Sequence, residues 1–295
     1  MAARRQPEPV TTVVQLLFHL GARLPLPLLH GLGALLGWAS FLLSPVYRRR
    51  LLANAHQASV SRADALASVA QAGRLVTELP RLWFGRPVAI RWDGAEHIDA
   101  ARARGTGLLF LTPHLGCFEI TAQAYAARYG ADRPMTVLFR PARQPWLRDL
   151  VASARQRPGL LTAPTTLAGV KQLIKALKAG EAVGLLPDQV PPDGQGVWAP
   201  FFGREAYTMT LSARLARSAR AQVLLAWGER LSWGRGFVVH VRPYDEATWG
   251  ALSDDPGIAA RQVNQAMEGL VRECPRQYLW SYHRYKTPAV SSLDA

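Results

Sequence analysis

Beyond residue 88 the chain alternates between short apolar runs and longer stretches in which apolar residues recur every three or four positions. Short apolar runs between turn residues predict buried strands, and the longer pattern predicts amphipathic helices. The predicted strands are 88–92, 107–112, 135–140, 182–187, 221–227 and 236–242. The predicted helices are 117–129, 145–156, 165–179, 208–219 and 257–273, after an Ala-rich helical stretch over 50–86. Strands that alternate with helices favour an α/β fold with a largely parallel central sheet flanked by helices.

The first part of the chain has a different pattern. Residues 13–43 are dominated by Leu, Val, Phe, Gly and Ala, and residues 24–47 carry no formal charge before the run Arg48–Arg50. This length permits one membrane span, but Pro25 and Pro27 suit a bent helix or a monotopic anchor better. A pair of buried core helices is the alternative. We expect a hydrophobic membrane anchor over 1–47 and one α/β domain over 48–295.

Two segments, 157–166 and 187–207, are rich in proline and glycine and are predicted to be long loops. Thr208 follows the second loop and is predicted to be the N-cap of the helix that starts there.

Composition limits the class of protein. Hydrophobic residues make up 49% of the chain and charged residues 19%, so a full core is expected and wholesale disorder is not. The net charge of +14 points to an anionic partner, which is nucleic acid, an acidic protein or a membrane surface. No nucleic-acid motif accompanies the charge, which disfavours the first. Two cysteines form neither a disulfide framework nor a metal-ligand spacing, which favours a reducing compartment.

Three predicted strands are each followed directly by a polar side chain. His114 follows the strand over 107–112, Arg140 the one over 135–140, and Asp188 the one over 182–187. Ligands of open α/β sheets bind outside the carboxyl ends of the strands. We therefore expect these three residues to line one site, with Arg140 and Asp188 contacting substrate.

His114 and Glu119 are the candidate catalytic pair. If Gly116 bends the chain before the helix, Glu119 reaches back to the imidazole and holds it as a general base. Backbone N–H groups near Gly116 and the Arg140 guanidinium are the candidate oxyanion donors. Three alternatives stay open: a structural His–Glu hydrogen bond, a metal site, for which no second ligand stands at a suitable spacing, and Cys117 as nucleophile.

These residues resemble a known family. "PHLGCFE" is similar to the His-x4-Glu motif of the bacterial lipid A late acyltransferases, the lauroyl and myristoyl transferases within the lysophospholipid acyltransferase superfamily. Four further stretches carry the resemblance: "GARLPLPLLHGLGALLG" (21–37), "FRPARQPWLRDL" (139–150), "DQVPPDGQGVWAPFFGREAYT" (188–208) and "CPRQYLWSYHRYK" (274–286).

The resemblance implies a glycerol-phosphate-acyltransferase-like fold and O-acyl transfer from acyl carrier protein to a hydroxyl of a lipid A precursor. Another phospholipid or glycolipid acceptor is the alternative substrate, and a membrane-bound binding protein with an inactive site is the alternative class. The resemblance also implies the cytoplasmic face of the inner membrane, and no cofactor or metal beyond the phosphopantetheine of the carrier. Carried over by position, His114 is the base, Glu119 its partner, and Arg140 and Asp188 line the site.

Overall fold

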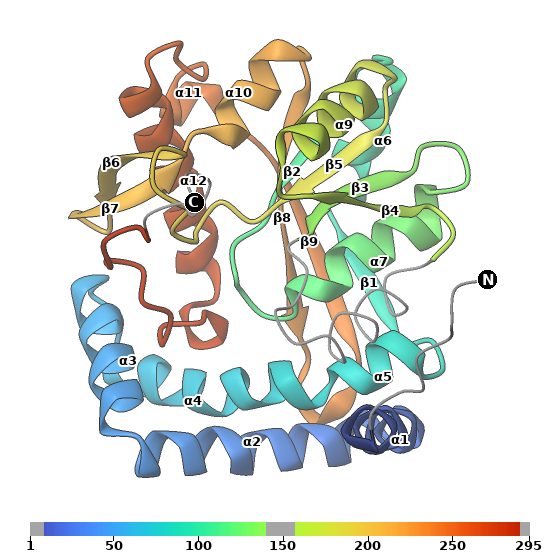
Figure 1. Cartoon of the computed structure of the whole chain (residues 1–295), viewed down its shortest axis with the longest axis vertical. Helices are drawn as coiled ribbons and strands as arrows, with labels where there is room; N and C mark the ends of the chain where they lie inside the picture. Colours follow the sequence, from blue (N-terminus) through green and yellow to red (C-terminus); the bar gives the residue numbers. More distant parts are fainter. Residues whose placement is uncertain (1–8, 140–156, 290–295) are drawn as a thin grey trace.

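A seven-stranded sheet in the order β1-β9-β8-β2-β5-β3-β4 forms the centre of the computed structural model, which describes residues 9–139 and 157–289 (Figure 1). Its strands are β1 (Ile90–Asp93), β2 (Leu108–Leu111), β3 (Met135–Phe139), β4 (Leu160–Pro164), β5 (Ala182–Leu185), β8 (Gln222–Arg230) and β9 (Phe237–Pro243). Every neighbouring pair is parallel except β8 and β9. The largely parallel sheet expected from the sequence is therefore confirmed.

Helices pack on both faces of this sheet, so its central strands are apolar at every position. Leu108 and Phe110 of β2 lie in one core with α7 (Phe118–Tyr129), and Leu109 and Leu111 lie in the other. The second core also holds α9 (Leu167–Lys178), α10 (Leu211–Ser218) and α12 (Pro256–Glu273). The remaining short helices are α6 (Ala95–Ala103), α11 (Glu246–Trp249), η1 (Ser232–Gly234) and η2 (Pro275–Gln277).

The N-terminal helices form a layer beneath the ends of β8 and β9 (Figure 1). They are α1 (Pro9–Arg23), α2 (Leu26–Leu43), α3 (Pro45–Gln57), α4 (Arg62–Thr77) and α5 (Leu79–Phe84). The apolar N-terminal pattern thus becomes two helices separated at Leu24–Pro25, in agreement with the expected bend. By length and composition α2 is able to cross a membrane, and a third of it is buried inside the protein.

The two predicted loops contain strands that sequence reasoning missed. β4 lies within 157–166, and β6 (Gly196–Phe201) pairs with β7 (Arg204–Met209) as an antiparallel hairpin. Because β7 extends to Met209, α10 begins only at Leu211, and its N-cap position is Thr210. The prediction that Thr208 caps a helix is wrong. Thr208 is buried in β7, where its hydroxyl accepts hydrogen bonds from Arg284 and Asn264 at 2.7 and 3.0 Å. The predicted helix over 145–156 lies outside the described residues.

Candidate active site

His114 and Asp188 meet at the carboxyl ends of two neighbouring parallel strands. β2 pairs with β5 from Leu108–Ala182 to Leu111–Leu185, so the segments that leave the two strands start side by side. The Nδ1 atom of His114 lies 2.7 Å from Oδ1 of Asp188, and the His114 backbone N–H donates to Oδ2 at 2.8 Å. Two bonds to one carboxylate fix both the ring and the main chain of His114.

Asp188 is a buried carboxylate that supports the histidine. Its relative exposure is 2%, and Oδ2 also accepts a hydrogen bond from the Tyr278 hydroxyl at 3.2 Å. Burial raises the pKa of Asp188, but the charge of His114, the hydrogen bonds from it and the charge of Arg284 outweigh burial, so the pKa lies below its usual value. An ionised Asp188 can only accept, so Nδ1 carries a proton, and in the neutral ring Nε2 then presents a lone pair. We expected Asp188 to contact substrate; the structure makes it the residue that positions His114.

Gln189 is the other partner of the imidazole, and sequence reasoning did not select it. Its Nε2 lies 2.9 Å from Nε2 of His114. Because the ring nitrogen is an acceptor in this tautomer, the Gln189 amide donates to it. The signal available in the sequence was its position directly after Asp188, at the end of the same strand.

Gly116 makes the turn between β2 and α7, as predicted. Its φ is +60°, and a Cβ at this position would lie 2.0 Å from the carbonyl oxygen of Gly228. Its N–H, however, donates to the carbonyl of Gln277, and the N–H groups of Leu115 and Cys117 donate to the carbonyls of Pro113 and Gly228. These three N–H groups are already satisfied within the chain, which disfavours them as oxyanion donors, and a contact of Gly116 with substrate stays a prediction.

Cys117 is unsuited to be a nucleophile. It is 0% exposed and follows Gly116 at the start of α7. Burial, together with the negative charge of Glu78, raises the pKa of the thiol well above its usual value, so the reactive thiolate is suppressed. The alternative of an acyl-enzyme on Cys117 is therefore disfavoured.

Glu119 lies in the first turn of α7 and lines a cavity beside His114 rather than holding its ring. Asp188 and Gln189 already contact both nitrogens of the imidazole, so the expectation that Glu119 orients the ring is wrong in that respect. Burial lowers the pKa of Arg157, and the negative charge of Glu119 offsets part of this effect. A direct catalytic part for Glu119 stays a prediction.

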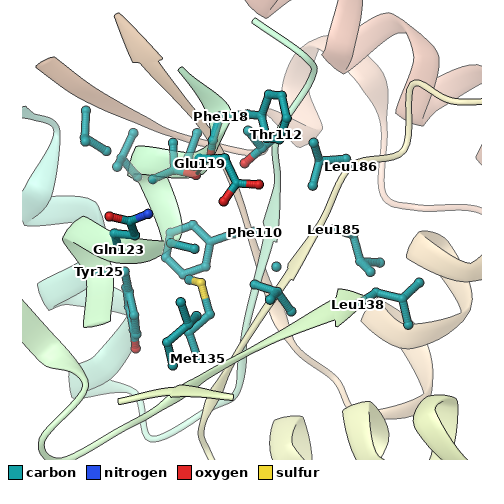
Figure 2. A pocket seen from close by; sticks show the side chains of 18 of the residues that line it. Phe110, Thr112, Phe118, Glu119, Gln123, Tyr125, Met135, Leu138, Leu185 and Leu186 are labelled. Atoms are coloured by element: carbon teal, nitrogen blue, oxygen red, sulfur yellow. Dashed lines mark hydrogen bonds between the residues drawn. The ribbon is translucent and has the colours of Figure 1, made fainter. Parts of the chain in front are cut away.

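The cavity beside Glu119 is mainly apolar and lies between α7 and one face of the sheet. Figure 2 shows the Glu119 carboxylate pointing into it near Thr112 and Phe118, with Phe110, Tyr125 and Met135 further in. Every strand of the sheet contributes to its lining. Gly184 of β5 has no side chain to fill the cavity, and a Cβ there would lie 3.2 Å from Val137 and 3.4 Å from Met135. Phe118 connects the cavity to the turn that carries His114, because its ring centroid lies 4.7 Å from that of His114.

Arg140 follows β3 directly in the chain but lies outside the described residues. Among the residues that the structure describes, no group of three or more His, Cys, Asp and Glu side chains is arranged to hold a metal ion. The expectation of a reaction without metal or cofactor stays a prediction.

The C-terminal segment closes the site from a distant part of the sequence. Besides the Tyr278 hydroxyl on Asp188, the backbone N–H of Leu279 donates to the His114 carbonyl at 3.1 Å. Arg284, which is buried, donates to the Tyr207 carbonyl and so joins this segment to the β6–β7 hairpin. Tyr278 therefore supports Asp188 through its hydroxyl in addition to packing in the core.

Comparisons with known proteins show which family the chain belongs to. A model of the family described as bacterial lipid A biosynthesis acyltransferase matches residues 11–287. The chain is 29% identical over 219 residues to the lipid A biosynthesis lauroyltransferase of Escherichia coli, an alignment that covers 73% of this chain and 68% of that protein. It is 27% identical over 195 residues to a lipid A biosynthesis acyltransferase of Haemophilus influenzae, covering 66% of this chain and 58% of that protein.

A third relative is the lipid A biosynthesis myristoyltransferase of Escherichia coli, at 26% identity over 199 residues, with 67% of this chain and 59% of that protein covered. The alignments with this protein and with the Haemophilus protein span less than two thirds of the length of each relative. The family match nevertheless extends from α1 to the C-terminal segment that closes the site. The chain belongs to the bacterial lipid A biosynthesis acyltransferase family.

Proposed function

We propose that this protein is an O-acyltransferase that moves a fatty acyl chain from acyl carrier protein to a hydroxyl of a lipid A precursor. The observation that carries the proposal is the His114–Asp188 pair, which stands beside an apolar cavity in a chain of this family. A ring nitrogen that can take a proton from an alcohol, next to an apolar cavity, is what transfer of a fatty acyl group to an alcohol requires.

His114 acts as the general base in this mechanism. Its Nε2 atom takes the proton of the acceptor hydroxyl while the hydroxyl oxygen attacks the thioester carbonyl of the donor. When the tetrahedral intermediate collapses, the new C–O bond is kept, the C–S bond breaks, and the imidazolium returns the proton to the leaving thiolate. Asp188 holds the neutral tautomer and stabilises the imidazolium that forms. No covalent enzyme intermediate is needed because the thioester is already activated.

Gln189 is the candidate donor to the oxyanion. The acceptor hydroxyl must reach Nε2 of His114, the atom to which the Gln189 amide donates. Once the hydroxyl takes that place, the amide N–H is displaced to the side and lies within reach of the thioester oxygen that gains charge. Arg140 stays a second candidate donor, as the sequence predicts.

The cavity under α7 is the proposed acyl-chain site. Its walls are apolar side chains, among them Phe110, Met135 and Leu185, which favour hydrocarbon over water. Phe118 lies between this space and the imidazole, so a chain in the cavity would place its thioester carbon near His114.

The charge of the protein suits the proposed partners. A net charge of +14 steers both an acidic carrier protein and a phosphorylated lipid toward the enzyme. The phosphopantetheine arm of the carrier delivers the acyl group, and no resident cofactor is proposed. The apolar helices α1 and α2 keep the enzyme at the cytoplasmic face of the inner membrane, where the lipid acceptor lies.

Purified protein incubated with acyl carrier proteins loaded with different chains and with a panel of lipid acceptors tests the proposal, with mass spectrometry of the products. We expect transfer to a glucosamine-based lipid A precursor and none with His114→Ala, which should remain folded. Cys117→Ala should retain most of the activity. Transfer to a glycerophospholipid or another glycolipid alone would overturn the proposed acceptor, and activity in His114→Ala would overturn the mechanism.

A further inference from the structure

The side of α2 that faces away from the protein is an uninterrupted apolar surface. Leu35 is 70% exposed and Leu43 is 82% exposed. The other exposed leucines of this side are Leu28, Leu32, Leu36 and Leu42. No Asp, Glu, Lys or Arg occurs anywhere in Leu26–Leu43, so nothing charged interrupts the surface. A continuous exposed stripe of this kind marks a binding surface.

The opposite side of α2 is packed tightly against α4. A Cβ on Gly37 would lie 2.2 Å from the Val69 carbonyl oxygen, and a Cβ on Gly73 would lie 1.9 Å from the Gly33 carbonyl oxygen. The hydroxyl of Thr77 also donates to the Leu29 carbonyl at 2.7 Å. Backbones this close form an interface that excludes lipid, so one side of α2 belongs to the protein interior.

A buried charge network fixes α2 to the catalytic turn. The side chain of His30 on α2 lies 3.0 Å from the Glu78 carboxylate, and Arg230 at the end of β8 donates to both oxygens of that carboxylate. Arg230 also donates to the Gly116 carbonyl at 3.3 Å. If α2 were inserted across a bilayer, it would leave α4, and these buried charges would lose a partner.

Basic side chains flank both ends of the leucine surface, and an exposed tryptophan lies at its N-terminal end. At the N-terminal end, Gly234 of η1 approaches Pro27, and the adjacent Trp233 is 85% exposed with φ of +59°. Arg235 is exposed on the same loop. At the C-terminal end Arg48 donates to the last carbonyls of α2, and the next residue, Arg49, is exposed.

From these observations we infer that α2 lies in the plane of one leaflet, with its leucine surface and Trp233 inserted together into an anionic bilayer. An exposed Trp beside a leucine stripe suits the headgroup boundary, and the arginines at both ends pair with lipid phosphates. The occupant of this surface is the lipid bilayer rather than a second copy or a soluble partner. The protein therefore binds one leaflet through two distant parts of its chain, and α2 does not span the membrane.

The inferred orientation places the active site next to the membrane. Arg230 connects the helical layer to the Gly116 carbonyl, and Gly116 lies two residues after His114. In Figure 1 the layer of α2 and α4 lies beneath the ends of the sheet strands that carry this turn. A lipid acceptor would therefore reach His114 from the surface without leaving the headgroup region. This last step rests on the proposed function; the membrane orientation does not.

Depth measurements on bound vesicles distinguish the two orientations. In a Cys274→Ser background, spin labels on Leu28→Cys, Leu35→Cys and Leu42→Cys report the depth of both ends and the middle of α2 in phosphatidylglycerol vesicles. We expect the same shallow depth for all three and an aqueous label for Leu167→Cys on α9, where the native side chain is 71% exposed. A deep Leu35 label with the two ends at opposite surfaces would overturn the inference, as would three aqueous labels.

Vesicle flotation tests the composition of the surface without any acyl donor or acceptor, so its failure is separate from a failure of acyl transfer. Leu35→Gln and Trp233→Ser should each weaken binding to the vesicles about tenfold, because each removes an apolar side chain that the bilayer would bury. The matched controls are Leu167→Gln and Trp198→Ser, which lie on α9 and β6 and should leave binding unchanged. Binding should fall with salt and with zwitterionic lipid. Equal losses in the controls, or none in Trp233→Ser, would contradict the inferred surface.

Discussion

At the scale of single residues, the partner of His114 determines how the imidazole is held. Asp188 contacts Nδ1 and the His114 backbone N–H, whereas Glu119 faces the cavity. Asp188→Asn would keep the shape but remove the charge that stabilises the imidazolium and fixes the tautomer. We expect kcat to fall by about 10³–10⁴-fold with little change in KM for either substrate.

The same kinetic measurements on Glu119→Gln and Tyr278→Phe separate the possible partners. Tyr278→Phe removes one hydrogen bond from Asp188 and should cost about tenfold or less in kcat. If Glu119→Gln loses as much kcat as Asp188→Asn, the two carboxylates act together. If Asp188→Asn changes KM alone, Asp188 binds substrate and does not position the base.

Gln189 provides a second test at this scale. If its amide stabilises the oxyanion, Gln189→Ala should lower kcat by about 10²–10³-fold. Gln189→Glu would place a carboxylate at Nε2 of His114 and favour the protonated ring, so the acidic limb of the pH–rate profile should move to higher pH. Gln195→Ala, an exposed position of the same connection, is the control and should retain full activity. An unchanged kcat in Gln189→Ala would exclude the amide as an oxyanion donor.

The sequence was sufficient to find His114 and the turn at Gly116, because an apolar run that ends in a polar residue reports the end of a buried strand. It also placed Asp188 in the site, since β5 ends in the same way. It could not assign the partner of the ring. Glu119 is close in sequence, but Asp188 is close in space, because β2 and β5 are neighbours in the sheet order.

At the scale of elements, the cavity between α7 and the sheet should determine the preferred acyl chain. Figure 2 shows Met135 of β3 deep in this cavity, away from Glu119. Met135→Ala would lengthen the available space, so the preferred donor chain should grow by about two or three methylene groups. The measurement is a competition among acyl carrier proteins that carry chains of different length.

Met267→Ala is the matched control for this prediction. Met267 is as buried as Met135 but lies on α12, in the core on the other face of the sheet. Both substitutions should destabilise the fold by about 2–5 kcal/mol, and only Met135→Ala should change the chain preference. A shift of the preference in both variants would show that loosened packing, and not the cavity, is responsible.

Periodicity predicted the strands and helices that bury a face on the main sheet, but not the β6–β7 hairpin. Gly196–Phe201 contains Pro200 and lies in a segment that is rich in proline and glycine, so local propensity indicates a loop. Side chains from distant elements hold the hairpin instead: Asn264 of α12 donates to the Pro200 carbonyl, and Arg284 to the Tyr207 carbonyl. Contacts of this kind leave no local pattern in the sequence.

At the scale of the whole molecule, the pairing of Glu78 with Arg230 joins the N-terminal helices to the sheet across 152 positions of sequence. Neither residue stands in a motif, and His30, which also contacts Glu78, lies within the 47 residues that the sequence predicts to be an anchor. The pairing makes the helical layer part of the same folded unit as the catalytic turn. Truncation before α3 would consequently remove His30 from a buried ionic network.

Glu78 should therefore make the stability of the whole fold depend on acid. Burial raises its pKa, but the charge and hydrogen bonds of Arg230, together with those of His30, outweigh burial and lower the pKa from 4.5 to about 2. A carboxyl whose folded pKa is lowered stabilises the fold above its unfolded pKa and loses that contribution as pH falls toward the folded value. Through this shift Glu78 contributes on the order of 3 kcal/mol to the free energy of unfolding at neutral pH.

Urea denaturation between about pH 7 and about pH 3 measures the contribution of Glu78. Glu78→Gln should lower the free energy of unfolding at neutral pH, because Arg230 is left as a buried charge without its carboxylate. The free energy of unfolding of this variant should also decline less steeply below about pH 4.5, because the contribution of Glu78 is gone. The slope that remains comes from Asp188 and the other carboxyls, which are unchanged. Glu96→Gln, at an exposed position of α6, is the control and should keep the full slope. If Glu78→Gln and Glu96→Gln decline in parallel, Glu78 is not the acid-sensitive link between the helical layer and the sheet.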